Sequence, residues 1–332
     1  RKTGLRILLL APHPFYQERG TPIAVNLLLE ALAARGHQVD VLTYHEGDNV
    51  THPGMTIHRI RRPLFVRNVG PGFSLKKLVC DWHMFWKLTC LVRCRKYDVI
   101  HAVEESVFMA MFAKWRRGIP YLYDMDSCMP QQIVAKHPLL RMVRPFMNWC
   151  ERRAIRGALA VVPMCDALAE DALRAGARRV FVLRDISLVD AAAVRPSPGM
   201  KEQLGVLATC FVYVGNLEKY QGIDLLLAAF ERALRGGLDG DLVIAGGAGA
   251  DVERYRAMAA RQFPNGHVHL IGHQPVARMA WLFDGADVLV SPRIDGTNTP
   301  MKIYSYLQSG KAIIATDLPT HTQVLKPAVA DL

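Results

Sequence analysis

The strongest constraint on this chain is a regular alternation of short apolar runs with segments of helical periodicity, which occurs twice along the sequence. The apolar runs are bounded by glycine, proline and polar residues, as buried strands are. Strands that alternate with helices form parallel sheets covered on both faces. The alternation lapses over residues 184–205, RDISLVDAAAVRPSPGMKEQLG, where proline and glycine cluster. We therefore expect two doubly wound α/β domains, residues 1–188 and 189–332, each with its ligand site at the carboxyl ends of its strands.

The periodicities also predict individual elements. The expected strands are Leu5–Ala11, Val39–Tyr44, Met55–Arg59, Asp98–Ala102, Tyr121–Asp124, Leu159–Val162 and Val180–Leu183, then Cys210–Val214, Asp241–Ala245, His267–Ile271, Asp287–Val290 and Ala312–Thr316. The expected helices include Pro22–Arg35, Leu75–Val92, Leu139–Arg156, Gly222–Arg235, Val252–Gln262, Val276–Phe283 and Met301–Ser309.

Length and cysteine usage set the broad class. A chain of 332 residues is too long for one ordinary core, which supports two domains. No apolar run reaches the length of a membrane span. The seven cysteines are irregularly spaced and form no C-x-x-C pair, which is typical of reduced thiols in a cytosolic protein. Because the sequence ends at VLKPAVADL, in what reads as the middle of a fold, we expect its C-terminal end to be truncated.

A loop near the C-terminal end has the build of an anion site. In SPRIDGTNTPMKIYSYLQSGKAIIATD, residues 291–317, Thr299 is expected to be the N-cap and Pro300 the first-turn residue of a helix that Gly310 ends. The free N–H groups at such a helix start stabilise a phosphate, and Arg293 and Lys302 could add full charges. An ordinary strand–loop–helix connection is the competing interpretation.

Three further strand ends carry glycine: FVYVGNLEKYQG, VIAGGAG and LIGHQP, which contain Gly215, Gly246 and Gly272. Glycine lets the backbone approach a ligand closely. One such turn would be weak evidence, but four at one edge of a sheet favour a nucleotide pocket over coincidence.

These stretches resemble the retaining glycosyltransferases of the GT-B fold, family 4. GNLEKYQG and residues 291–317 look like that family's donor-binding domain. RILLLAPHPFYQERGTPIAVNLLLEALAARGHQVDVLT, YDVIHAVEES and IPYLYDMDS are similar to its acceptor-binding domain. The resemblance implies two Rossmann-like domains that face each other across a cleft, with the acceptor in the first and a nucleotide-sugar donor in the second. It also implies transfer of the sugar to an acceptor hydroxyl with retained anomeric configuration and without an enzymic nucleophile.

The sequence departs from the family at positions that would touch the donor. Two glutamates that the family places beside the donor sugar align with Thr297 and Ser305. Its diphosphate-binding arginine and lysine align with Asn216 and Gln221, and a histidine that many members carry aligns with Val103. Either other residues have taken over these roles or activity is lost; the retained glycines favour the first.

We expect the diphosphate to lie over Gly296–Pro300 and near Gly215–Asn216. Thr297, Asn298 and Thr299 are candidates for the sugar, and Lys219, Arg293 and Lys302 for the phosphates. The full set of donor-binding candidates is Gly20, Thr21, Gly215, Asn216, Lys219, Gly246, Gly272, Arg293, Gly296, Thr297, Asn298, Thr299 and Lys302. The nucleotide sugar is then a co-substrate; no cofactor is expected, and a metal is not expected to be essential.

In the first domain, His101, Glu104 and Asp126 are the catalytic candidates, because they lie at strand ends that border the expected cleft. A carboxylate there could act as base toward an acceptor hydroxyl. Asp124 and Asp126 form a D-x-D pair, for which acceptor hydrogen bonding is favoured over metal binding. For Glu105, a solvated helix start is an equally good interpretation.

Positive charge is concentrated in the first domain. The chain has a net charge of +11, and residues 51–100 hold ten Lys or Arg but only two acids. Residues from 201 onward hold twelve Lys or Arg and thirteen acids. One apolar stripe at helical spacing comprises Leu75, Leu78, Val79, Trp82 and Trp86. A basic helix with such a stripe could lie at a membrane interface or pack on its own sheet. No nucleic-acid motif accompanies the charge. We therefore expect a cytoplasmic protein, peripheral on the inner face of the membrane through residues 59–96, whose lipid-binding cations include Lys76, Lys77, Arg93, Arg95 and Lys96.

The function expected is retaining sugar transfer from a nucleotide-diphosphate donor, in the synthesis of a glycolipid, a polysaccharide or another cell-envelope glycan. A nucleotide-sugar epimerase of the same fold is one alternative. A degenerate scaffold that binds a sugar nucleotide without turnover is another.

Overall fold

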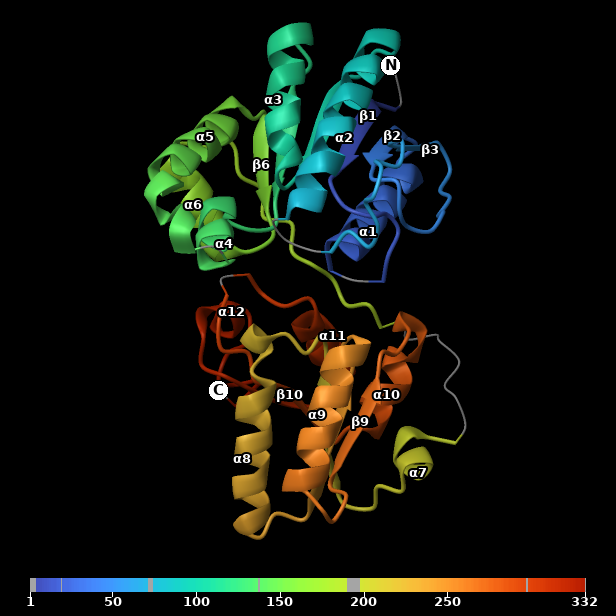
Figure 1. Ribbon diagram of the computed structural model, residues 1–332, viewed down its shortest axis with the longest axis vertical. Coiled ribbons are helices and arrows are strands. Elements are labelled where there is room, and N and C mark those ends of the chain that lie inside the picture. The colour runs from blue at the N-terminus through green and yellow to red at the C-terminus, as the bar shows by residue number, and fades with distance from the viewer. Residues whose placement is uncertain are drawn as a thin grey trace. The chain divides into compact units, whose positions relative to one another are not determined.

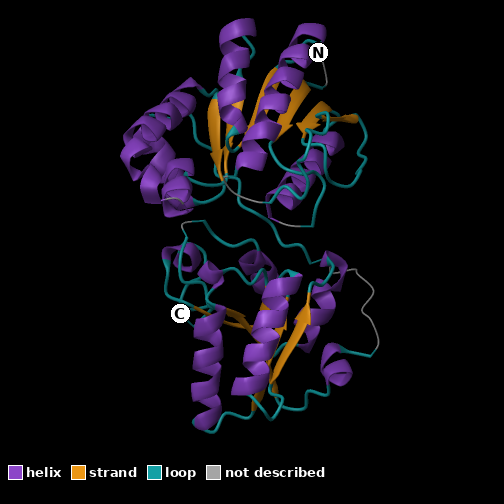
Figure 2. Ribbon diagram, in the orientation of Figure 1, coloured by secondary structure: helices purple, strands orange, loops and turns teal. Residues whose placement is uncertain are grey.

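The computed structural model describes residues 4–18, 20–70, 74–136, 138–189, 198–296 and 298–331. The chain divides into two compact units, Arg1–Arg184 and Asp185–Leu332 (Figure 1). The sequence prediction placed the boundary between residues 188 and 189. Figure 2 shows that each unit consists of strands enclosed by helices.

The first unit contains a six-stranded sheet in the order β3-β2-β1-β4-β5-β6, with every neighbouring pair parallel. Its strands are β1 (Arg6–Ala11), β2 (Gln38–Thr43), β3 (Met55–Arg59), β4 (Val99–Val103), β5 (Tyr121–Met125) and β6 (Ala160–Pro163). Its helices are α1 (Gly20–Ala34), α2 (Leu75–Cys94), α3 (Ser106–Arg117), α4 (Met129–Lys136), the 3₁₀ helix η1 (Pro138–Val143), α5 (Arg144–Gly157) and α6 (Asp166–Ala175).

The second unit contains a five-stranded parallel sheet in the order β11-β10-β7-β8-β9. Its strands are β7 (Thr209–Val214), β8 (Gly240–Ala245), β9 (Val268–Gly272), β10 (Val288–Ser291) and β11 (Ala312–Ala315). Its helices are α7 (Met200–Leu204), η2 (Lys219–Gln221), α8 (Ile223–Arg235), α9 (Gly249–Gln262), η3 (Val276–Arg278), α10 (Met279–Gly285), α11 (Lys302–Ser309) and α12 (Pro319–Thr322).

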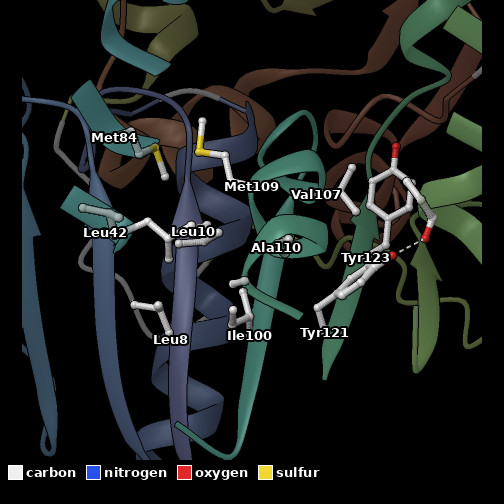
Figure 3. Close-up of a cluster of buried hydrophobic side chains, with 14 of the residues drawn as sticks. Leu8, Leu10, Leu42, Met84, Ile100, Val107, Met109, Ala110, Tyr121 and Tyr123 are labelled. Atoms are coloured by element: carbon white, nitrogen blue, oxygen red, sulfur yellow. Dashed lines mark hydrogen bonds between the residues drawn. The ribbon is translucent and has the colours of Figure 1, made fainter. Parts of the chain in front are cut away.

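Both faces of each sheet are buried, as the continuous apolar strands require. In the first unit α2, α3, α5 and α6 cover one face and α1 covers the other. Figure 3 shows the first of these cores, where Met84 of α2 and Met109 of α3 pack with Leu10, Leu42 and Ile100 of the sheet. In the second unit α7, α10 and α11 cover one face, and α8 and α9 the other. The expectation of two doubly wound parallel-sheet domains is confirmed.

Two details of the prediction are wrong. The expected strand Val180–Leu183 forms only a single bridge, from Val180 to Val161. The expected helix Leu139–Arg156 is a 3₁₀ helix followed by α5, whose first turn contains Pro145. Proline has no N–H to continue a preceding helix, and it is tolerated only in a first turn, so the chain starts a new helix there.

The strand orders locate the ligand edge of each sheet. In the first sheet the order reverses between β1 and β4, and in the second between β7 and β10. At such a reversal the helices after the two strands lie on opposite faces, and the carboxyl ends leave an opening where ligands bind. The residues that follow β4, β7 and β10 therefore have the strongest claim to a functional role.

Candidate functional site

Glycine turns dominate the carboxyl edge of the second sheet. Gly215 follows β7 with φ of 153°, and Gly246 follows β8 with φ of 117°. A Cβ added to Gly246 would collide with the carbonyl oxygen of Gly215, so the two turns are stacked directly on each other. The Gly246 N–H donates to the carbonyl of Gly272, at the end of β9, over 2.7 Å. Three of the four predicted glycine turns therefore form one continuous surface.

The turn at the start of α8 adds a fourth contact to this edge. Gly222 has φ of 73°, a conformation that L side chains rarely adopt, and an added Cβ would overlap the carbonyl oxygen of Pro292. Pro292 belongs to the loop after β10. The loops that follow β7 and β10 are thus packed against each other at the reversal point of the sheet.

Lys302 reaches this surface from α11. Its ammonium donates to Oε1 of Gln221 over 3.2 Å and lies 4.0 Å from the centre of the Tyr213 ring. Nζ would also lie 3.1 Å from a Cβ added to Gly215. The pKa of Lys302 lies well below its usual value, mainly because the side chain is desolvated and secondly because of the like charge of Arg293. The lysine therefore occupies the neighbourhood of position 221, where the resemblance to family 4 would have placed a lysine.

Arg293 follows β10 and is buried. Its Nε donates to the carbonyl of Asp295 over 2.6 Å, and its terminal nitrogens donate to the backbone and side-chain oxygens of Asn298 over 3.2 and 3.0 Å. The guanidinium lies 5.1 Å from the ring centre of Tyr220. Burial lowers the pKa of Arg293. Across the described residues, no carboxylate forms an ion pair with Arg293 or Lys302.

The start of α11 differs from the sequence prediction. Its N-cap is Met301, with helical φ and no capping side chain, rather than Thr299. The Thr299 side chain is completely buried, and its Oγ1 has no hydrogen-bond partner among the residues that the structure describes. The prediction that Gly310 ends this helix is confirmed, with φ of 68° and its N–H donating to Leu307. A buried hydroxyl thus remains unsatisfied beside the helix start.

The positions where this chain departs from the family have taken up structural contacts. Ser305 Oγ accepts the backbone N–H of Leu188 over 3.0 Å and lies 3.3 Å from Ser187 Oγ. It therefore anchors the segment that follows the first unit. The side-chain amide of Asn216 donates to the Tyr220 hydroxyl over 3.2 Å. Thr297, a candidate for sugar binding, lies outside the described residues.

The remaining donor candidates are Lys219, Gly20, Thr21 and Gly296. Lys219 is exposed in η2. Gly20 opens α1 in the first unit, and Thr21 follows it in the first turn. Gly296 has φ of 121° and is held against the Arg293 guanidinium. The structure thus joins most of the second-unit candidates into one site, whereas Gly20 and Thr21 belong to the first unit.

Sequence reasoning missed four side chains at this edge, because tyrosine and histidine at a strand end or in a helix form no motif. Tyr213 donates to the carbonyl of Asn216 over 2.6 Å beneath the Lys302 ammonium. Tyr306 accepts the N–H of Val214 over 3.0 Å. His321 is completely buried, between Ser291 Oγ at 2.9 Å and the Thr316 carbonyl at 2.9 Å. Tyr220 is the fourth, since it supports both Arg293 and Asn216.

In the first unit, two predicted residues lie on adjacent strands. His101 Nε2 is 2.8 Å from Asp124 Oδ2, and the histidine is 5% exposed. These residues lie on β4 and β5, whose parallel register pairs His101 with Leu122. A histidine held by a carboxylate in this way has a fixed orientation. Asp126, the third catalytic candidate, is half-buried just after β5.

Glu104 is part of a buried charge cluster at the reversal point of the first sheet. Its backbone has φ of 48°, and its carboxylate lies 3.8 Å from Lys77 Nζ, which also forms an ion pair with Glu105. The pKa of Glu104 is raised to about 7, mainly by burial and secondly by the negative charge of Glu105. Burial likewise raises the pKa of Asp81, which accepts the Tyr44 hydroxyl over 2.5 Å, to about 7. A carboxyl with such a pKa can accept or release a proton at neutral pH.

No cluster of three or more His, Cys, Asp or Glu side chains with the arrangement of a metal site occurs within the described ranges. None of the helices that the structure describes is both long and apolar enough to span a bilayer.

Comparisons with known proteins agree with this architecture. Residues 19–184 match the family described as Glycosyl transferase 4-like domain, and residues 206–331 match Glycosyl transferases group 1. An α-D-kanosaminyltransferase of Streptomyces kanamyceticus is 27% identical over 262 residues, which cover 72% of this chain and 67% of the relative.

Solved structures show the same fold. Sucrose-phosphate synthase from Thermosynechococcus elongatus superposes with a TM-score of 0.72 at 20% identity, covering 95% of this chain and 82% of that one. HepE of Anabaena, solved in complex with UDP, superposes with a TM-score of 0.70 at 14% identity, covering 98% and 85%. The chain belongs to the group 1 glycosyl transferases, family 4 of the GT-B fold, and is a glycosyltransferase, an enzyme that transfers a sugar.

Proposed function

We propose that this glycosyltransferase uses a nucleoside-diphosphate sugar and transfers the sugar to an acceptor hydroxyl with retention of anomeric configuration. One observation carries the proposal. At the carboxyl edge of the second sheet, the half-buried Lys302 lies beside the stacked glycine turns and the buried Arg293 lies beside Gly296, and neither forms an ion pair with a carboxylate among the described residues. A buried cation without an ion-pair partner is costly unless a ligand supplies the opposite charge.

A diphosphate fits this arrangement. Over Gly296–Pro300 and near Gly215, its oxygens could accept N–H groups from the start of α11 and the charge of Lys302. As the bond between the anomeric carbon and the diphosphate oxygen breaks, negative charge grows on the leaving group. The helix start and the two cations stabilise that charge, which is usually the largest contribution to catalysis. They take the place of the arginine and lysine that Asn216 and Gln221 replace.

The chemistry needs no enzymic nucleophile when the acceptor attacks from the face that the diphosphate leaves. The acceptor oxygen then bonds to the anomeric carbon, and its proton passes to the departing phosphate oxygen. In the first unit, Glu104 and the paired His101 and Asp124 are suited to bind the acceptor hydroxyl and orient it. The UDP complex of the structurally similar HepE supports a nucleotide donor in this fold.

We place the reaction in the synthesis of a glycolipid, a polysaccharide or another cell-envelope glycan, on the cytoplasmic side of the membrane. The support is the distribution of charge: the excess of Lys and Arg lies in residues 51–100 of the acceptor unit, not in the donor unit. Anionic lipid near the acceptor would attract such a segment.

A panel of nucleotide sugars tests the transfer proposal. With a suitable acceptor, the protein should release free nucleotide, and NMR should show that the product keeps the anomeric configuration of the donor. An inverted product would refute the retaining mechanism. A changed sugar without any acceptor would indicate an epimerase instead, and binding without turnover would indicate a scaffold.

A further inference from the structure

The apolar stripe of α2 faces solvent. The helix buries a different face, formed by Lys77, Cys80, Met84, Leu88 and Leu91, against the first sheet. Trp82 is 61% exposed and Trp86 is 54% exposed, and the other three members of the stripe are also exposed. Packing of this stripe on the protein's own sheet, one of the two interpretations that the sequence left open, is therefore wrong.

The exposed stripe continues onto α3, which lies beside α2 (Figure 1). The rings of Trp82 and Trp86 are 5.8 Å apart, and Phe85 beside them packs 4.9 Å from Phe112 of α3. Phe112 in turn lies 5.7 Å from Trp115, whose side chain is 78% exposed. A row of aromatic rings thus crosses from one helix to the other, with three indoles in solvent.

The loop before α2 presents two more apolar side chains. Leu64 is 84% exposed and Phe65 is 99% exposed. Phe65 has φ of 63°, which is unfavourable for a bulky residue. Because its side chain is exposed, no apolar burial compensates for that cost. The loop is nevertheless held in place: Glu46 accepts the N–H of Asn68 and of Val69 over 2.7 and 2.9 Å. A loop fixed by hydrogen bonds thus holds its two largest apolar side chains in water.

Exposed positive charge predominates in residues 51–100. Both acids of residues 51–100 are engaged in the fold, because Asp81 accepts the Tyr44 hydroxyl and Asp98 accepts the Arg6 N–H over 2.7 Å. Two of the expected lipid-binding cations are also engaged: Lys77 is buried with Glu104 and Glu105, and Arg95 pairs with Asp40 at 2.8 Å. The exposed cations that remain are Arg61, Arg62, Arg67, Lys76, Lys87, Arg93 and Lys96.

We propose that the Leu64–Phe65 loop and the exposed aromatic face of α2 and α3 insert into the interface of an anionic lipid bilayer. Tryptophan favours the boundary between headgroups and acyl chains, because its ring is apolar and its N–H is polar. Surrounding Lys and Arg bind the anionic headgroups, while the apolar side chains leave water. A protein partner would also cover apolar side chains, but the seven exposed cations, three of them arginines that flank Leu64 and Phe65, favour a lipid surface.

Insertion has a different signature from electrostatic attraction alone. High salt screens the cations, but it does not weaken the burial of Leu64 and Phe65. The protein should therefore sediment with phosphatidylcholine vesicles that contain phosphatidylglycerol, and part of this binding should persist at high salt. The double variant Leu64→Glu, Phe65→Glu should lower the partition coefficient at least about tenfold. Leu207→Glu is the matched control, since Leu207 is 99% exposed in the second unit.

Tryptophan fluorescence reports the inserted side chains. Vesicles of brominated phosphatidylglycerol should quench the wild-type emission, and replacement of Trp82, Trp86 and Trp115 by Phe should remove most of that quenching. Circular dichroism and UDP binding, unchanged by the substitutions, would show that each variant is folded. Equal partitioning of the double variant and of Leu207→Glu would overturn the proposal. A lack of wild-type binding to the phosphatidylglycerol vesicles would also overturn it, and would favour a protein partner for this surface. Neither result bears on sugar transfer.

Discussion

Replacement of Lys302 by Met tests whether this lysine has taken over the missing phosphate contact. In the free protein its half-buried side chain has one hydrogen bond to Gln221, the ring of Tyr213 and the like charge of Arg293 beside it. Methionine has a similar length and needs no hydrogen bond, so it can fill the same space. A diphosphate would lose one charged hydrogen bond, worth about 1.5–3 kcal/mol. UDP binding should therefore weaken about tenfold to 150-fold.

The same change should stabilise the free protein. Because the pKa of Lys302 is depressed in the folded state, the unfolded chain binds more protons between that depressed pKa and the unfolded value of about 10.4. The free energy of unfolding of the wild type should consequently rise with pH through this window. Lys302→Met should abolish that rise and raise the melting temperature at neutral pH.

Calorimetric titration with UDP and thermal unfolding at several pH values measure the two effects. Lys326→Met is the control, because Lys326 is exposed in the same unit and, among the described residues, donates only to the Thr322 carbonyl. Unchanged UDP affinity in Lys302→Met would show that other groups carry the phosphate charge. A lower melting temperature would show instead that the Lys302 ammonium stabilises the free protein.

Three further predictions concern single positions. Gly222→Ala should lower the free energy of unfolding, measured with urea, by more than Gly310→Ala does. Both glycines have positive φ, which costs an alanine about 1–2 kcal/mol, but only at Gly222 does the added Cβ meet a backbone carbonyl. Equal losses would contradict this. Burial raises the pKa of Glu151 to about 7, so the folded state binds more protons than the unfolded chain between about pH 4.5 and 7. The free energy of unfolding should therefore fall as pH rises through this range. Glu151→Gln should flatten that fall and raise the free energy of unfolding by up to about 3 kcal/mol at pH 7. Asp124→Asn should lower kcat about tenfold to a hundredfold by releasing His101, with little change in UDP affinity; a loss confined to UDP affinity would refute its acceptor role.

The fold could be predicted because it depends on local patterns. Apolar runs of strand length, alternating with helical periodicity, fix a doubly wound parallel sheet whatever the side chains do later. Glycine positions were equally readable, since Gly215, Gly222 and Gly246 lie at strand and helix ends where only glycine fits. The helix boundary at Pro145 was missed because apolar periodicity continues through it, although proline cannot continue the hydrogen bonding.

The candidate site was only partly predictable, because its contacts join residues distant in sequence. Lys302 and Gln221 are 81 positions apart, yet their side chains meet at the edge of the second sheet. That the lysine replaces a charge lost at position 221 is visible only when both side chains are placed. The ion pairs that remove Lys77 and Arg95 from the exposed charge are equally invisible in sequence.

The sequence by itself determined that α2 is a basic amphipathic helix, and the tertiary structure decided which of its faces is buried. Both faces satisfy a 3.6-residue period, one through Cys80, Met84 and Leu88 and the other through Trp82 and Trp86. The first face packs closely over the sheet, and the indoles of the second remain outside. Periodicity records that a face is apolar; the shape of the neighbouring core decides whether that face can be buried there.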